Sequence, residues 1–151
     1  MAPFRFRLNA ILEWYRKQYQ LEQGRLGTCA ERAVQAETEL ERHRKDVLAL
    51  QLELIQAPAV QALELVALGS FRHRAKQREV LLRQNWLKSR QAFDHQRTVV
   101  QAAQRRLRLI ERLRDKRLSE YDYELSRELE ALASESHLAA FARGLNDPPN
   151  P

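Results

Sequence analysis

The sequence has little of the residues that break or cross-link a chain: its 151 residues include one cysteine, four glycines and five prolines. The single Cys29 cannot form a disulfide within the chain, which agrees with a reducing compartment. The prolines stand at only three places, namely Pro3, Pro58 and the segment 148–151. Because proline interrupts helical hydrogen bonding, these places are the expected helix breaks, and two long uninterrupted segments lie between them.

Long apolar runs are also missing. The longest run near the start is Ala10-Ile11-Leu12, with charged residues close on both sides, so the sequence predicts neither a signal peptide nor a membrane span. The four histidines are far apart in the sequence, and no glycine-rich phosphate loop is present. We therefore expect a cytosolic protein that is not an enzyme and has no cofactor or metal.

Apolar residues recur in both long segments at alternating steps of three and four residues. Such a 3.5-residue period predicts a coiled-coil seam, and the later 3-4-4 steps of the second segment relax left-handed supercoiling. The seam of the first segment is Leu8, Leu12, Tyr15, Tyr19, Glu22, Leu26, Cys29, Ala33, Ala36, Leu40, His43, Val47, Leu50 and Leu54. The seam of the second is Leu82, Trp86, Ser89, Phe93, Gln96, Val100, Ala103, Leu107, Ile110, Arg114, Leu118, Tyr121, Leu125, Leu129 and Leu132.

These periods predict an all-α fold, a long antiparallel two-helix coiled-coil hairpin in a single domain over residues 1–144. The first helix is expected over about 4–56, as one helix with a soft point at Gly24 and Gly27. Pro58 and the Gly69-Ser70 pair favour a tip over 57–70, which is either a loop or contains a short helix over 59–68. The second, longer helix is expected over about 71–143, followed by a disordered tail at 145–151.

The second helix is expected to extend beyond the first. If Ala57 lies opposite Ser70, paired positions sum to about 127, which puts Phe4 beside Tyr123 and leaves residues after about Glu124 without an internal partner. An apolar surface of this kind indicates an interface. A folded-back tail, a longer contact with the first helix and self-association are the alternatives. The surface consists of Leu125, Leu129, Leu132, Leu138 and Phe141.

Charge is distributed unevenly along the chain. Residues 71–120 carry fifteen Lys/Arg against five Asp/Glu, whereas residues 121–151 carry two against six. A basic block favours a solvated helix face or an acidic partner. DNA is not an expected partner, because the arginine run at 105–117 has no aromatic residue for stacking on bases and its arginines spread around the helix. Glu111 and Asp115 lie within the run and can pair with part of its charge.

Two stretches resemble the FliJ family of flagellar export proteins. "FRFRLNAILEWYRKQYQLEQ" is similar to the family's opening, an aromatic-basic alternation followed by leucine and an amphipathic helix. "LIERLRDKRLSEYDYELSRELEAL" is similar to its second helix, in which a basic cluster precedes an acidic stretch with aromatic residues. The resemblance runs along the whole chain, although "ALASE" stands where many members have an acidic "LDE"-like end.

The resemblance implies a cytosolic, non-enzymatic stalk of the flagellar type III export apparatus, peripheral to the inner membrane. Proteins of this family place their paired termini in the ring of the export ATPase and reach with the other end toward the cytoplasmic domain of the export gate protein. They also interact with export chaperones. A generic coiled-coil scaffold or dimerisation protein, and a basic nucleic-acid-binding coiled coil, are the alternative functions.

Two candidate sites follow from this reading. The first is at the paired chain ends and the second is near the hairpin tip. The residues of the second site would also form the tip core of any helical hairpin, and that is the alternative interpretation of them. The candidate ATPase interface is Phe4, Phe6, Leu8, Ile11, Leu125, Leu129, Leu132, Leu138 and Phe141. The candidate gate interface near the tip is Leu50, Leu54, Leu68 and Phe71.

Overall fold

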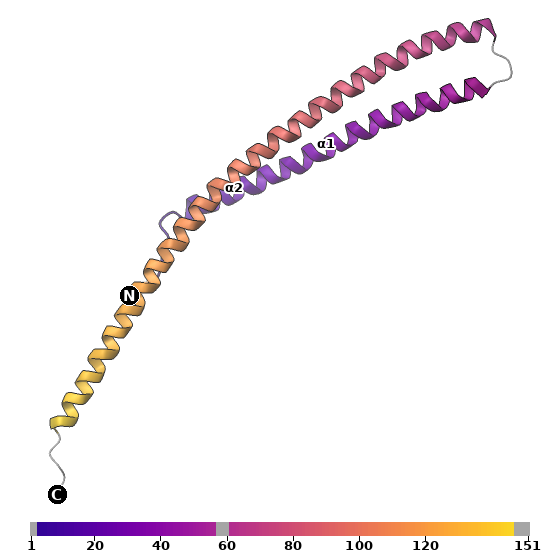
Figure 1. Cartoon of the computed structure of the whole chain (residues 1–151). Coiled ribbons are helices and arrows are strands. Elements are labelled where there is room, and N and C mark those ends of the chain that lie inside the picture. Colours follow the sequence, from indigo (N-terminus) through magenta and orange to yellow (C-terminus); the bar gives the residue numbers. More distant parts are fainter. Residues whose placement is uncertain (1–2, 57–60, 147–151) are drawn as a thin grey trace. The chain divides into compact units, whose positions relative to one another are not determined.

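The computed structural model describes residues 3–56 and 61–146, with backbone only for 144–146. Two helices make up almost all of this: α1 (Asn9–Gln56), of 48 residues, and α2 (Ala62–Asn146), of 85 residues (Figure 1). The described residues form no strand. The helices pack against each other in opposite directions, so the predicted all-α helical hairpin is confirmed.

The chain divides into two compact units, which are described separately. The terminal unit comprises residues 1–16 and 105–151, and the tip unit comprises residues 17–104. Each unit contains a part of α1 packed against a part of α2. Neither helix contains a stretch within the described residues that is apolar enough to cross a bilayer.

The buried residues lie on the predicted seams. Leu12 and Leu107 are buried in the terminal unit, and Ala33, Ala36 and Leu40 of α1 are buried in the tip unit. On α2 the tip unit buries Leu82 and also Ala75, which continues the seam by one heptad toward the tip. No described glycine has a positive φ, so α1 passes through Gly24 and Gly27 without a break, as predicted.

The two polar residues of the α1 seam each find a partner on α2. The Gln96 amide donates to a carboxylate oxygen of Glu22 at 2.5 Å and to its backbone carbonyl at 3.2 Å. His43 donates through Nε2 to the backbone carbonyl of Ala75 at 2.9 Å. Pairing of this kind keeps part-buried polar groups satisfied, which explains how the seam tolerates them.

The predicted tip boundary at Gly69-Ser70 is wrong, because α2 begins nine residues before position 71 and runs through both residues. At its start the backbone N–H of Gln61 donates to the Glu64 carboxylate at 2.9 Å, a cap that the spacing of these two residues could have indicated. Helix continuity also aligns Leu68 and Phe71 on the side facing α1. The remainder of the expected tip, residues 57–60, lies outside the described residues.

The predicted start of the first helix at about residue 4 is also wrong. Residues 3–8, called here the N-terminal arm, are not helical, and α1 begins only at Asn9. The alternation of aromatic and basic residues has a period of two, which suits an extended chain better than a helix. Phe4 lies beside Tyr121, two residues before the expected Tyr123.

At the other end α2 continues to Asn146, three residues beyond the predicted end at 143. Two residues of the expected disordered tail, Leu145 and Asn146, are therefore helical. The rest of that tail, residues 147–151, lies outside the described residues.

Candidate interaction surfaces

The N-terminal arm packs on α2 through alternate side chains. Phe4, Phe6 and Leu8 are half-buried, whereas Arg5 and Arg7 are exposed. The ring centroids of Phe4 and Tyr121 are 5.6 Å apart with the planes at 55°. Arm and helix together line an open groove of about 950 Å³, to which α2 contributes Leu113, Arg117, Glu120, Tyr121 and Glu124. The structure thus brings three of the predicted ATPase-interface residues to one place.

Beyond its contact with the arm, no described residue packs on α2. Every side chain described from residue 126 to residue 143, a segment called here the overhang, is exposed. Leu129, Leu132, Leu138 and Phe141 are 58%, 61%, 67% and 63% exposed, whereas Leu125 at the edge of the arm is half-buried. The overhang predicted from the sequence is present, and the described residues of α1 do not cover it. A folded-back tail would involve residues 147–151, which lie outside the described residues.

Leu125 and two leucines of the overhang form a face next to the arm groove. Leu125, Leu129 and Leu132 stand at helical spacing and continue the side of α2 that carries Tyr121. Leu138 and Phe141 are three residues apart on an adjoining side. Ile11, the remaining predicted residue, is 44% exposed beside the fully buried Leu12. These residues are not all in mutual contact, since Leu129, Leu132, Leu138 and Phe141 project into solvent.

The four predicted tip residues are brought together. Leu50 and Leu54 of α1 and Leu68 and Phe71 of α2 line one groove of about 330 Å³, with Ala67 and Glu64. None of the four is fully buried, and Leu50 is 42% exposed. They therefore lie around one groove between the two helices while remaining open to solvent, so both interpretations of these residues are compatible with their positions.

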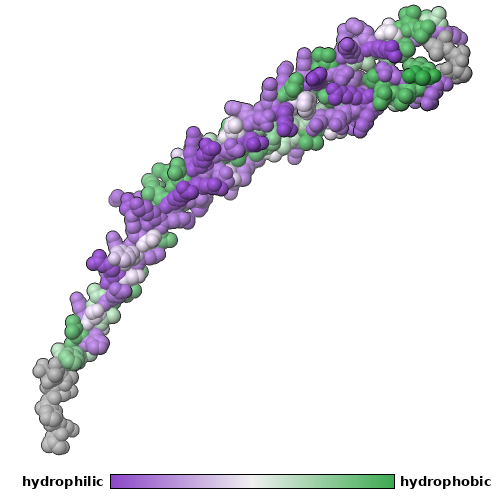
Figure 2. All heavy atoms as spheres, in the orientation of Figure 1, coloured by the Kyte–Doolittle hydropathy of each residue, from purple (hydrophilic) through white to green (hydrophobic). Residues whose placement is uncertain are grey.

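The sequence reasoning missed a larger apolar surface at the tip. Apolar side chains gather near the end of α1 and the start of α2 (Figure 2). The segments "LALQLELIQ" and "ALELVAL" contain more leucines than a single seam can bury, and that excess was the available signal. The exposed residues are Leu48, Leu52, Ile55, Leu63, Leu65 and Val66, at 56%, 51%, 78%, 79%, 57% and 69%.

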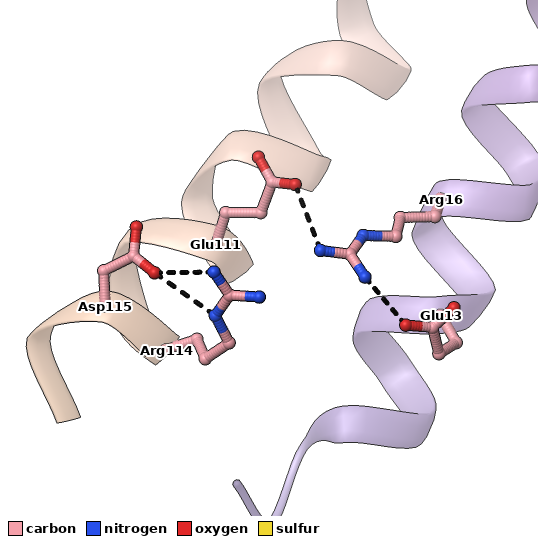
Figure 3. Close-up of polar contacts among 5 residues, drawn as sticks. All are labelled: Glu13, Arg16, Glu111, Arg114 and Asp115. Carbon is pink, nitrogen blue, oxygen red and sulfur yellow. Dashed lines mark hydrogen bonds and ion pairs between the residues drawn. The ribbon is translucent and has the colours of Figure 1, made fainter. Parts of the chain in front are cut away.

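Two acidic residues of α2 in the terminal unit, Glu111 and Asp115, form ion pairs with arginines (Figure 3). Glu111 of α2 lies 3.7 Å from Arg16 of α1, which also contacts Glu13 at 2.8 Å. Asp115 accepts two hydrogen bonds from its neighbour Arg114. The two acidic residues within the arginine run are therefore directed at Arg16 and Arg114.

A second charged contact lies in the tip unit. The Arg44 guanidinium donates to the Glu79 carboxylate at 2.8 Å, and this hydrogen bond holds the pKa of Glu79 below its ordinary value. Nearby His43 and Arg83 act in the same direction. Arg44 and Glu79 line an open groove of about 480 Å³ between the helices.

No group of histidine, cysteine or acidic side chains in residues 3–56 and 61–143 is arranged to hold a metal ion. Comparison of the chain with protein-family models, curated proteins and solved structures found no match. The resemblance to the FliJ family therefore stays a prediction.

Proposed function

We propose that the chain is a non-enzymatic stalk component of a flagellar type III export apparatus in the cytoplasm, peripheral to the inner membrane. In this proposal the terminal unit binds the ring of the export ATPase and promotes its assembly and protein export. The tip unit contacts the cytoplasmic domain of the export gate protein, and export chaperones are further partners.

The overhang carries this proposal. A helix whose leucines are more than half exposed loses free energy by leaving them in water, and burial contributes on the order of 1.5–3 kcal/mol for each large apolar side chain before ordering costs. The exposed face stands beside the groove of the N-terminal arm, so both chain ends contribute to one surface. A ring that encloses paired termini would cover both together.

The lengths of the helices also support a stalk. At about 1.5 Å per residue, α1 follows a path of roughly 70 Å and α2 one of roughly 130 Å. The apolar tip residues give the tip unit a second surface for a partner, as the gate contact requires.

The test uses the purified export ATPase with the full-length chain and with a version that ends at Glu124. Ring assembly is followed by light scattering and ATP turnover in the same samples. We expect the full-length chain to promote both and the shortened version to promote neither. A quadruple variant, with Leu129, Leu132, Leu138 and Phe141 changed to alanine, tests the face without shortening the helix.

Two results would contradict the proposal. If the full-length chain leaves the ATPase unchanged, the flagellar assignment fails and a generic scaffold becomes the better account. Equal promotion by both versions would keep the ATPase as partner but exclude the overhang as the contact. A matched control changes the tip residues Leu63, Leu65 and Val66 to alanine, which should leave ATPase promotion intact and weaken gate binding.

The scaffold alternative is favoured by one observation, namely that apolar side chains are exposed at the overhang and also at the tip. Self-association would cover them without any export protein. Sedimentation of the chain alone over a wide concentration range decides this point. A monomer mass at all concentrations supports the stalk, whereas a stable dimer that buries either surface supports the scaffold.

A further inference from the structure

Arginines on the outer side of α2 in the terminal unit lack an acidic partner among the described residues. Arg105, Arg106, Arg108 and Arg112 are all exposed, and none of them forms an ion pair with a described residue. Their neighbours differ, because Arg114 and Arg117 pair with Asp115 and Glu120.

The acidic residues nearest to these arginines are directed elsewhere. Glu111 contacts Arg16 on α1, and Asp115 contacts Arg114 (Figure 3). Glu120 contacts Arg117 at 3.0 Å and Lys116 at 4.0 Å. These acidic residues therefore neutralise charge on Arg16, Arg114, Lys116 and Arg117, and not on the four exposed arginines.

One apolar residue stands among the free arginines. Leu109 is 63% exposed, and it lies four residues after Arg105, three after Arg106 and three before Arg112. Residues at these spacings are neighbours on a helix surface, so the three arginines flank the leucine. We call Leu109 and the arginines at 105, 106, 108 and 112 the arginine patch.

This arrangement is unfavourable within the chain itself. Arg108 is three residues from Arg105 and four from Arg112, and like charges at these spacings destabilise a helix. An exposed leucine among them adds no packing. A local arrangement that conflicts with stability without compensation inside the molecule points to a partner outside it.

We propose that the arginine patch docks a protein segment that presents carboxylates around an apolar side chain. Each guanidinium is planar and matches a carboxylate through two parallel hydrogen bonds. Leu109 contacts the apolar side chain at the centre of the partner segment. When these two side chains exclude water, the ion pairs around them become stronger.

Nucleic acid and lipid fit this patch less well. Stacking on bases needs aromatic side chains, and residues 105–112 contain none. Insertion into a bilayer surface needs a broad apolar face, whereas this side of the helix offers Leu109 among four cations. A carboxylate-rich protein segment uses both the charge and the leucine.

The experiment measures binding of the full-length chain to two fluorescent probes at low salt by anisotropy. One probe is a synthetic helical peptide in which glutamates flank leucines at three- and four-residue spacing, and the other is a poly(dT) oligonucleotide. The patch variant changes Arg105, Arg106 and Arg112 to glutamine. The control variant changes the exposed Arg72, Arg78 and Arg97 of the tip unit to glutamine and so removes the same charge.

We expect the patch variant to bind the peptide about tenfold more weakly than the wild-type chain, and the control variant to stay within about twofold. Leu109→Gln should weaken peptide binding about threefold without any change in net charge. Circular dichroism of each variant checks that the helices remain folded.

Three outcomes overturn the proposal. Equal losses in the patch and control variants would show that only net charge matters, and tighter, patch-dependent binding of poly(dT) would make the patch a nucleic-acid site. Failure of the wild-type chain to bind the peptide would exclude the proposed chemistry. None of these results involves the export ATPase, so the proposed function and the arginine patch succeed or fail separately.

Discussion

Two stretches of α2 in the terminal unit carry leucines at the same helical spacing in opposite surroundings. In residues 105–125 the seam residue Leu107 is 8% exposed, whereas in the overhang Leu129 and Leu132 are 58% and 61% exposed. Spacing therefore determines which side of a helix is apolar, and the length of the partner determines whether that side is covered. Exposed leucines at regular spacing beyond the end of a partner helix are a signal of intermolecular contact.

The largest expected effect tests this comparison directly. Leu12 is the one described side chain with no exposed surface, and Leu12→Ala should lower the free energy of unfolding by about 3 kcal/mol because it removes buried apolar area and leaves a cavity. Leu132→Ala should change it by less than about 0.5 kcal/mol. Urea unfolding followed by circular dichroism measures both. Similar losses would mean that the overhang is covered in solution, for example by a second copy.

Substitution of glycines in α1 should raise the free energy of unfolding, whereas the substitution of Leu12 lowers it. A Cβ at Gly24 or Gly27 meets nothing within 4 Å, and neither residue has a positive φ, so alanine at each position should stabilise the protein by about 1 kcal/mol through helix propensity. The reverse change in the overhang, Ala133→Gly, should leave global unfolding unchanged and increase only local amide exchange.

Urea unfolding and hydrogen exchange on the same samples measure these effects. A loss of stability in Gly24→Ala or Gly27→Ala would mean that something packs on α1 at these glycines. A global effect of Ala133→Gly would mean that the overhang unfolds together with the paired helices.

A third prediction concerns polarity within the covered seam. The Glu22 side chain is 13% exposed and accepts a hydrogen bond from Gln96 in addition to its ion pair with Arg25. Gln96→Ala should cost about 1–2 kcal/mol, because the part-buried carboxylate loses a donor. The exposed Gln101→Ala is the matched control and should have almost no effect. If Gln96→Ala is also neutral, water replaces the amide and the seam is open at this point.

Much of the fold followed from the sequence, because a seam of about seven heptads is a strong signal that local variation cannot remove. Periodicity identified the buried Leu12, Leu40, Leu82 and Leu107, and the overhang followed from the unequal lengths of the helices. The helix ends were less predictable. Gly69 and Ser70 are typical of a helix boundary, but α2 continues through both of them, because Leu68 and Phe71 lie on the side that faces α1.

The candidate surfaces were predictable only in part. Phe4, Phe6 and Leu8 were selected as members of a helix. They share a surface instead because the arm is not helical and its alternate side chains are half-buried in a groove that α2 also lines. The arginine patch could not be identified from the sequence. Which arginines are paired depends on the direction taken by Glu111 and Asp115, and the direction of Glu111 depends on the position of Arg16 on α1.

The smallest expected effect lies at an exposed edge. Arg44 lowers the pKa of Glu79, so this carboxyl should titrate below its ordinary value, and Arg44→Gln should move the pKa back upward. A lowered pKa in the folded protein means that the pair stabilises the fold above the unfolded pKa and that this contribution is lost as the pH falls through the folded pKa. NMR titration of the Glu79 carboxyl in both proteins measures the shift, with Arg42→Gln as the control. Because both side chains are substantially exposed, added salt should reduce the shift, and a shift that resists salt would show that a partner or a second copy covers this edge as well.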